Sequence, residues 1–502
     1  MTDDEQSLPN DIEQLKAMLL AERKQSAEQA ARLVFLEEQF RLAQQQRFGT
    51  SSEGHPAQGD LFNEAEAELD AIEDIKESTP TQAKKKPVRQ KLPKDLEREV
   101  IIHDLREDEK SCDCCGKPLH KMGESRSEKL EFIPAKVKVI EHVRLKYSCR
   151  TCEKEGISTQ VKSAPVPPSP IPKGFATPSL LSQIITSKYQ YALPLYRQES
   201  LFKQYGIALS RKTMSEWMMK CSELFKPLYE KLQKILLQQN IIQADETTLN
   251  VINEDKAKCY MWLYCTGSDA PVQSSLPNIV LFDYQSGRAG QCAVDYLDGY
   301  SGYLQVDGYA GYEKTNATLV GCWAHARRKF KEAEIAQPKG KTGKANIALS
   351  HIQKLYRLEI QLKDKTSAHK YQSRQEQAKP LLAQFYQWLE KASVPPKTAL
   401  GKAIQYCKNQ WHKLIRYIED GNLNIDNNRA ERAVKPFVIG RKNWLFSNTA
   451  NGAKASAMHY SLIETAKANG LVPFDYLMHC LEQLSKPKID INSLLPWNIK
   501  LS

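Results

Sequence analysis

The sequence predicts a multidomain α/β protein in which a mixed-sheet domain follows several smaller modules. The chain has 502 residues, more than one hydrophobic core usually organises. From about residue 240, segments with a strand pattern alternate with helical ones, which indicates an α/β sheet. Charge runs and a proline-rich stretch divide the part that precedes it. We therefore expect about two to four domains.

The composition is that of an ordinary globular protein, with 41% hydrophobic and 26% charged residues. The formal net charge of +11 favours a polyanionic partner without establishing one. No apolar run approaches the roughly 18 residues that a membrane-spanning helix needs. The acidic start MTDDEQSLPND lacks the features of a secretory signal. We expect a cytoplasmic, nucleoid-associated protein and exclude a membrane protein or a secreted disulfide miniprotein.

Residues 1–49 are predicted to form a coiled-coil helix. Residues 12–46 contain neither Gly nor Pro and carry an imperfect heptad. A zipper that makes a homodimer and an amphipathic helix docked on its own domain are both consistent with this pattern. The apolar residues that form its two seam positions are Ile12, Leu19, Leu33 and Phe40, and Leu15 and Leu36.

Residues 50–95 are predicted to be a flexible charged linker, because an acidic stretch is followed by the basic run KKKPVRQKLPK. The basic run could contact phosphates or simply be solvated.

Residues 96–163 carry two C-x-x-C pairs, which predict a zinc-binding module. Tetrahedral zinc takes four thiolates from two such turns, and this spacing favours structural zinc over free cysteines. The alternation between the pairs suggests two β-strands. Cys114 is an additional cysteine that could replace a neighbour. The predicted zinc ligands are Cys112, Cys115, Cys149 and Cys152.

Residues 164–235 are predicted to be helical and to contain a helix–turn–helix. Leu195, Leu201, Phe202 and Tyr205 would form one apolar face of the first helix, and Gly206 supplies the turn. Ser210 would cap a second helix. Its apolar face would comprise Met214, Trp217 and Met218, while the outward residues Arg211, Lys212 and Ser215 could contact DNA. A plain helical hairpin is the alternative.

Residues 236–470 are predicted to form the α/β domain, and residues 471–502 a C-terminal helix and tail. NIIQADETTLNV would be a strand ending at Asp245, and GYLQVDGYAGY a strand ending at Asp307. Carboxylates at strand ends can meet at the rim of a sheet and share divalent cations. Asp283 is a rival metal ligand, and Glu246 should point to the opposite side of its strand.

The third acid is predicted in NIDNNRAERAVKPFVIGRKNWLFSN. Asp426 would cap a helix from Asn427, and Glu431 would lie on its polar face among basic side chains. His325 could touch this site or merely pack. Trp411 could stack on a base, although core packing suits it better. The basic residues predicted to hold DNA are Arg432, Lys435, Arg441 and Lys442.

Taken together, these segments resemble the insertion-sequence-66 family of bacterial transposases. The resemblance covers nearly the whole chain, through strings such as RFGTSSE, PIPKGFATPSLLSQIITSKYQYALPLYRQE, VDGYAGY and CWAHARRKF. It implies a DDE-type recombinase with an RNase H-like core. It also implies an N-terminal zipper, a zinc module and a helix–turn–helix. Residues 331–420 are themselves helix-forming and highly charged, which predicts a helical insertion between the second and third acids. The tail after 485 looks specific to this protein or a subgroup.

The resemblance implies that Asp245, Asp307 and Glu431 hold two Mg²⁺ (or Mn²⁺) ions for cleavage of element ends and strand transfer into target DNA. The expected partners are the terminal inverted repeats, target DNA, a second copy of the chain and accessory proteins of the same element. Two alternatives remain at this stage: an RNase H-like nuclease without joining activity, and an inactive DNA-binding regulator.

Overall fold

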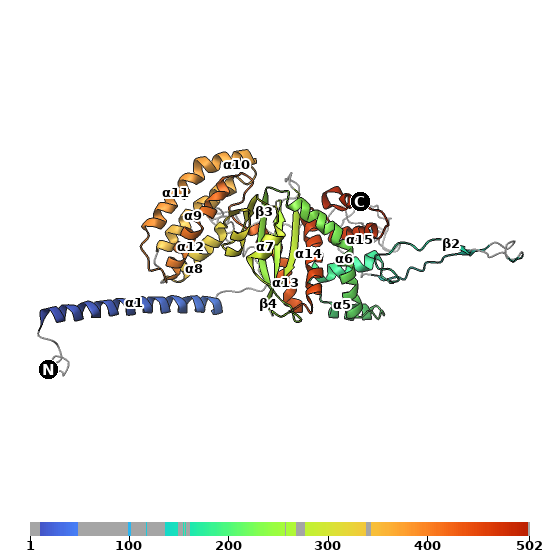
Figure 1. Cartoon of the computed structure of the whole chain (residues 1–502), viewed down its shortest axis with the longest axis horizontal. Coiled ribbons are helices and arrows are strands. Elements are labelled where there is room, and N and C mark those ends of the chain that lie inside the picture. The colour runs from blue at the N-terminus through green and yellow to red at the C-terminus, as the bar shows by residue number, and fades with distance from the viewer. Residues whose placement is uncertain are drawn as a thin grey trace, which may run out of the picture. The chain divides into compact units, whose positions relative to one another are not determined.

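Figure 1 shows the computed structural model of the chain, which describes residues 11–48, 99–101, 117, 136–148, 154, 156, 161–256, 258–267, 277–337 and 343–499. The chain divides into two compact units, residues 74–164 and the remainder. The predicted linker at 50–95 falls wholly outside the described residues. Cys114 and the four predicted zinc ligands lie outside them as well.

Helix α1 (Ile12–Phe48) confirms the predicted long N-terminal helix. The heptad side chains are between 39% and 68% exposed, so no other described segment of the chain covers the seam. Near its end, Glu38 accepts a hydrogen bond from the backbone N–H of Ala399, and Arg41 donates to the carbonyl of Ala336. The helix thus touches its own unit at one end, while most of the seam remains available for another helix.

In the unit formed by residues 74–164, β1 (Lys146–Tyr147) pairs antiparallel with β2 (Lys162–Ser163). The two strands predicted between the cysteine pairs are therefore reduced, in the described stretch 136–148, to the two residues of β1.

Three helices lie between β2 and the central sheet: α4 (Pro178–Tyr189), α5 (Leu195–Gln204) and α6 (Arg211–Leu236). Gly206 has a φ of +75°, and the Ser210 hydroxyl accepts the backbone N–H of Thr213 at 3.1 Å, which confirms the predicted turn and cap. The predicted apolar face of α5 is partly wrong. Leu201 and Tyr205 are 37% and 42% exposed. The side of α5 that faces the core contains Phe202 instead.

The second helix has its predicted inward face, since Met214, Trp217 and Met218 are all at most 5% exposed. Helix α6 is far longer than a turn–helix pair requires. Its Tyr229 hydroxyl donates to the carbonyl of Phe282 in the sheet domain, so this helix is part of the same hydrophobic core as the sheet.

The central sheet has five strands in the order β5-β4-β3-β6-β7. Pairings β3–β4 and β4–β5 are antiparallel, whereas β3–β6 and β6–β7 are parallel, which confirms a mixed sheet. The strands are β3 (Ile241–Asn250), β4 (Lys258–Thr266), β5 (Ile279–Gln285), β6 (Tyr303–Gln305) and β7 (Thr318–Val320).

Helices cover both faces of the sheet. On one face, Phe282 packs against Phe437 of α13 (Asn428–Trp444) and Tyr460 of α14 (Ala450–Ala468). On the other face, Tyr264 stacks on Tyr296 of α7 (Gly290–Tyr296) at a centroid distance of 4.0 Å. A short 3₁₀ helix, η4 (Ala310–Lys314), follows β6.

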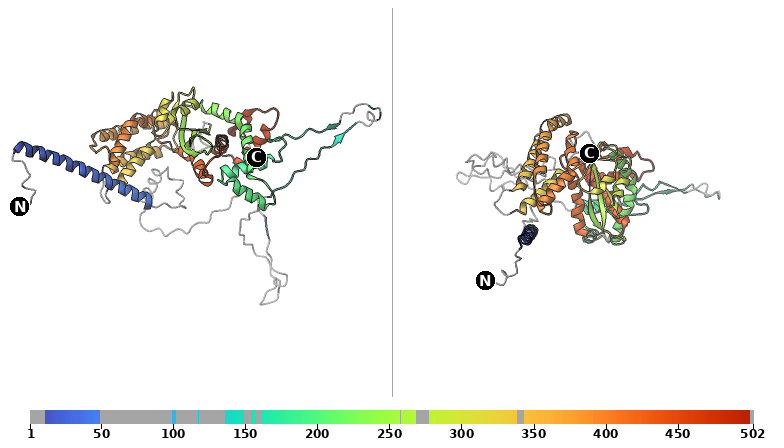
Figure 2. Two further views of the ribbon diagram at one scale, coloured as in Figure 1. Left: turned by 60° about the horizontal axis from the view of Figure 1, so that its bottom comes forward. Right: turned by 60° about the vertical axis from the view of Figure 1, so that its left-hand side comes forward.

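The segment between β7 and α13 is helical and has a hydrophobic core of its own. Figures 1 and 2 both show these helices grouped to one side of the sheet. Trp411 packs there against Trp323, Phe385 and Tyr386, which fits the core role expected for it. The elements are α8 (Trp323–Ile335), α9 (Lys344–Gln361), α10 (Ser367–Ser373), the π-helical η5 (Arg374–Ala378), α11 (Lys379–Lys391), α12 (Ala399–Leu414) and η6 (Ile415–Ile418).

Helix α15 (Pro473–Leu484) and the 3₁₀ turns η7 (Ile491–Leu494) and η8 (Pro496–Asn498) complete the chain. The hydroxyl of Tyr476 donates to the carbonyl of Leu494, whose side chain is fully buried, so the tail is packed onto the domain. Among the described helices, none combines the length and the apolar character needed to cross a bilayer.

Candidate active site

Strand register brings Asp245 and Asp307 next to each other. The parallel pairing of β3 with β6 ends at Gln243 opposite Gln305, and the two acids each lie two residues further on. Side chains two residues apart on an extended chain point to the same face, so both carboxylates lie on the same side. The prediction that β3 ends at Asp245 is wrong, because β3 continues to Asn250 in its antiparallel pairing with β4. What ends before Asp245 is the parallel pairing of β3 with β6.

Both carboxylates are held by nearby backbone groups. Asp245 accepts the N–H of Glu246 at 2.8 Å, and Asp307 accepts the N–H of Tyr309 at 2.8 Å. Burial raises the pKa of Asp245 well above its ordinary value, and the charges of Glu246, Asp307 and Glu431 raise it further. The three predicted acids therefore lie within electrostatic reach of one another.

Helix α13 carries Glu431 to these strands. The helix begins at Asn428, one residue later than predicted, with Asn427 as its N-terminal flank. Asp426 still accepts the backbone N–H of Asn428, at 3.1 Å. The Asn427 side-chain amide donates to the carbonyl of Ala244, at 2.8 Å, and so ties the start of the helix to the residue before Asp245.

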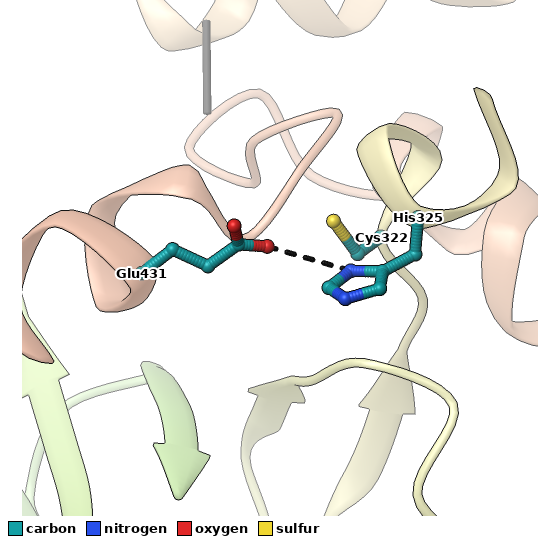
Figure 3. A group of neighbouring side chains, drawn as sticks. All are labelled: Cys322, His325 and Glu431. Atoms are coloured by element: carbon teal, nitrogen blue, oxygen red, sulfur yellow. Dashed lines mark ion pairs between the residues drawn. The ribbon is translucent and has the colours of Figure 1, made fainter. Parts of the chain in front are cut away.

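The face of α13 that was predicted to be polar is buried, since Asn427 and Glu431 are 1% and 4% exposed. Figure 3 shows Glu431 directed at His325 of α8, and the Glu431 Oε1 to His325 Nδ1 distance is 3.4 Å. Arg328, one turn further along α8, approaches Glu431 Oε2 at 3.5 Å. His325 therefore belongs to the site rather than merely packing nearby.

Burial raises the pKa of Glu431 to about 7 and lowers the pKa of His325 to about 4. At neutral pH the imidazole is therefore uncharged, and its contact with Glu431 is not an ion pair. Neither facing atom has a hydrogen-bond partner in the described part of the chain. A buried carboxylate oxygen without a donor is costly unless a cation binds it.

Glu246 and Asp283 lie on the opposite face of the sheet. Glu246 of β3 and Asp283 of β5 each pair with Trp262 of β4, the strand between them. Asp245 is displaced by one position in this register, so its side chain points to the other face. Glu246 is bound there by Arg288 and by the Tyr312 hydroxyl, and Asp283 accepts from Gln285 at 2.7 Å. Strand alternation thus separates Asp283 from the three predicted acids.

The oxygen donors of Asp245, Asp307 and Glu431 fit a divalent cation such as Mg²⁺, which prefers carboxylate ligands. The raised pKa values of Asp245 and Glu431, caused by burial and by repulsion from neighbouring acids, are what a site lacking its countercharge would show. The sequence argument missed Arg328 and Cys322. The available signal was their spacing in CWAHARRKF, where Cys322 lies three residues before His325 and Arg328 three residues after it.

The basic residues predicted to contact DNA differ in their surroundings. Arg211, Lys212 and Lys442 are exposed, and Ser215, Arg432 and Lys435 are half-buried. The Arg441 guanidinium donates to the hydroxyl of Thr247, at 2.9 Å, and therefore holds α13 against β3.

Comparison with known protein families matches nearly every part of the chain. The family described as "Transposase IS66 family" matches residues 173–455, and "zinc-finger binding domain of transposase IS66" matches 109–153. "Transposase C of IS166 homeodomain", a leucine-zipper family, matches 35–101. "IS66 C-terminal element" matches 461–497, so the expectation that the tail after 485 is specific to this protein or a subgroup is wrong as far as residue 497.

Similar chains occur in Sinorhizobium fredii. "Uncharacterized protein y4qI" is 32% identical over 98% of each chain. "Uncharacterized protein y4jD" is 32% identical over 82% of this chain and 81% of its own, and "Uncharacterized protein y4hP" is 32% identical over 83% and 78%. No solved structure matches.

Proposed function

This chain belongs to the IS66 family of transposases, and we propose that it cleaves DNA at the ends of an insertion element and joins those ends to target DNA. One observation carries the proposal. Asp245 and Asp307 occupy equivalent positions just beyond the last paired residues of β3 and β6, and the buried Glu431 on α13 lies within electrostatic reach of Asp245. The strand order and directions also support an RNase H-like core with a helical insertion.

Asp245, Asp307 and Glu431 would hold two Mg²⁺ (or Mn²⁺) ions in this proposal. When bound, such ions neutralise phosphate charge and activate a water or hydroxyl oxygen. In the first step water attacks the phosphorus at the element's end, and the 3′ oxygen leaves and takes up a proton. The freed 3′-OH then attacks a target phosphodiester in line, with a second 3′ oxygen as the leaving group.

The residues around the acids would position the DNA. Arg432, Lys435 and Lys442 would contact its backbone and make affinity fall as salt rises. Arg441 would contribute mainly by fixing α13 on β3. Arg211, Lys212 and Ser215 at the start of α6 would approach DNA as a helix–turn–helix does.

The remaining modules would assemble the complex. Cys112, Cys115, Cys149 and Cys152 would bind a structural zinc ion, within the stretch that matches a zinc-finger family. The N-terminal helix would pair with a second copy, and accessory proteins of the element would join the complex. Its substrate would be cytoplasmic, nucleoid DNA.

The test compares Asp245→Asn, Asp307→Asn and Glu431→Gln with wild type on labelled DNA carrying the element's ends. We expect each to lose Mg²⁺-dependent cleavage and joining and to weaken Mn²⁺ binding, measured by water-proton relaxation, while end binding persists. Asp283→Asn is the matched control, because it makes the same change on the opposite face of the sheet. Full joining by any of the three variants would refute the assignment.

Two further outcomes separate the alternatives. Cleavage without joining, even with pre-cleaved ends, would identify a nuclease. End binding with neither reaction in wild type would identify a regulator.

A further inference from the structure

Three side chains of different chemistry meet at the start of α8. Cys322 immediately precedes the helix, His325 lies one turn into it, and Glu431 reaches them from α13 (Figure 3). One ligand atom from each side chain lies within 4.8 Å of those of the other two. Sulfur, imidazole nitrogen and carboxylate oxygen together are a ligand set typical of Zn²⁺ and unsuited to Mg²⁺.

We propose that Cys322, His325 and Glu431 form a zinc site that removes Glu431 from the magnesium site and so inhibits the enzyme. The binding part of this inference stands on the geometry alone, and the inhibitory part rests on the proposed function.

The present distances are close to those that zinc requires. Metal–ligand distances of about 2.0–2.3 Å in a tetrahedral site place neighbouring ligand atoms about 3.5 Å apart. His325 Nδ1 and Glu431 Oε1 already lie 3.4 Å apart. The Cys322 sulfur lies within 4.8 Å of a ligand atom of each partner and would have to approach them to complete the site.

The polar atoms here are also poorly satisfied by the protein. Glu431 is 4% exposed, and its Oε1 and the Nδ1 of His325 face each other without a hydrogen bond. A cation between them would use lone pairs that the described protein atoms leave unused. Buried polar atoms ordinarily form hydrogen bonds within the core, and these two atoms do not.

Burial and the charges of Asp426 and Glu431 raise the pKa of the Cys322 thiol well above its ordinary value, so a metal would have to displace its proton, and one backbone group is placed to help. The Cys322 sulfur accepts the N–H of Asn427 at 3.2 Å. Zinc binding would displace the thiol proton to water, and the N–H would then stabilise the resulting thiolate. Three protein ligands leave a fourth position open for water or a DNA phosphate oxygen.

The choice between metals follows from ligand softness. Zinc gains from the thiolate and imidazole, which magnesium cannot use, so micromolar zinc would compete with millimolar magnesium for Glu431. Glu431 contacts His325 in this structure and would have to turn from it to bind a magnesium ion with the two aspartates, so the two metals would exclude each other.

The experiment uses the full-length protein and zinc itself. Equilibrium dialysis at buffered micromolar zinc, followed by metal analysis, is expected to show one zinc fewer per chain in Cys322→Ser and in His325→Gln than in wild type. Cys407→Ser, also a fully buried cysteine but outside any such cluster, is the control and should bind as wild type does. The predicted cysteine module contributes equally to all four proteins.

Equal zinc content in all four proteins would overturn the site, as would the same loss in Cys407→Ser. Should Cys322→Ser fail to fold, as judged by circular dichroism, His325→Gln decides, because that ring is 27% exposed and tolerates replacement more easily.

Inhibition is measured separately, by joining assays in millimolar Mg²⁺ with increasing zinc. Each variant is compared with its own zinc-free rate, and about tenfold more zinc should be needed for half-inhibition once a soft ligand is lost. Zinc bound without inhibition would overturn the inhibitory part. If wild type joins no DNA at all, the proposed function fails, whereas the dialysis result still decides the site.

Discussion

The hydrogen bond from Asn427 to Ala244 gives the most direct test of how helix α13 is placed beside the proposed site. The Asn427 side-chain amide donates to the carbonyl of Ala244 at 2.8 Å, where the β3–β6 pairing has just ended. The amide thus takes the place of the next sheet hydrogen bond and fixes the start of α13 beside Asp245. Replacing Asn427 by Ala removes the donor and keeps all three acids.

The expected loss of stability follows from two contributions. The lost hydrogen bond is worth about 1 kcal/mol net, and the carbonyl left without a donor beside a side chain that is 1% exposed costs about 1–2 kcal/mol more. We therefore expect Asn427→Ala to lose about 2–3 kcal/mol, which is a shift of several degrees in melting temperature for a domain of this size. Joining should fall at least about tenfold even where the protein is folded, because a small displacement of a catalytic group is costly.

The assay combines thermal melting by circular dichroism with joining measured well below the melting temperature. Asn422→Ala is the matched control. This exposed asparagine bonds to Asp420 only, among the described contacts, and its loss should change stability by less than about 0.5 kcal/mol. If Asn427→Ala melted and joined DNA as Asn422→Ala does, the bond would not be what positions Glu431.

Two further predictions concern other buried charges. Arg374, 2% exposed, binds Glu359 with two nitrogens and donates to the carbonyls of Tyr417, Asp420 and Leu423. Arg374→Met should therefore destabilise the helical insertion by about 3–5 kcal/mol in urea or thermal unfolding, whereas Arg357→Met, on the exposed side of α9, should not; equal melting of the two would contradict this. Burial raises the pKa of Asp283 to about 6 in the folded protein, so the wild type loses stability as pH rises from about 4 to about 6. Asp283→Asn should match the wild type near pH 4 and exceed it by up to about 3 kcal/mol at pH 7, and a difference independent of pH would show that Asp283 does not titrate in this way.

The sequence was informative wherever a local pattern decides the structure. The apolar strands, the cap at Ser210 and the turn at Gly206 depend on neighbouring residues, and the structure has them. The acids at 245 and 307 could be located because an acid after an apolar strand is unusual. The end of β3 was misplaced because strand length depends on the partner strand β4, which local alternation does not reveal.

Burial along α13 shows where local pattern stops being informative. Glu431 was assigned to a polar face of its helix, and polarity suggested exposure, whereas both Glu431 and Asn427 are buried. Helical spacing indicates which residues share a face and leaves open what that face contacts. The contact here is with β3 and α8, and these elements are separated from α13 by the whole insertion. His325, Arg328 and Cys322 were unassigned for the same reason.

The insertion has its own core, yet it is connected to the site at its end. Arg374 holds the carbonyl of Leu423, and the Tyr356 hydroxyl donates to Asp426, two residues before α13 begins. From there, Asn427 and Arg441 fix the two ends of α13 on β3. The position of Glu431 is thus set by β3 and by the last loop of the insertion. Changes in the outer helices α10 and α11 should therefore leave the acids in place, whereas changes at Arg374 should reach them.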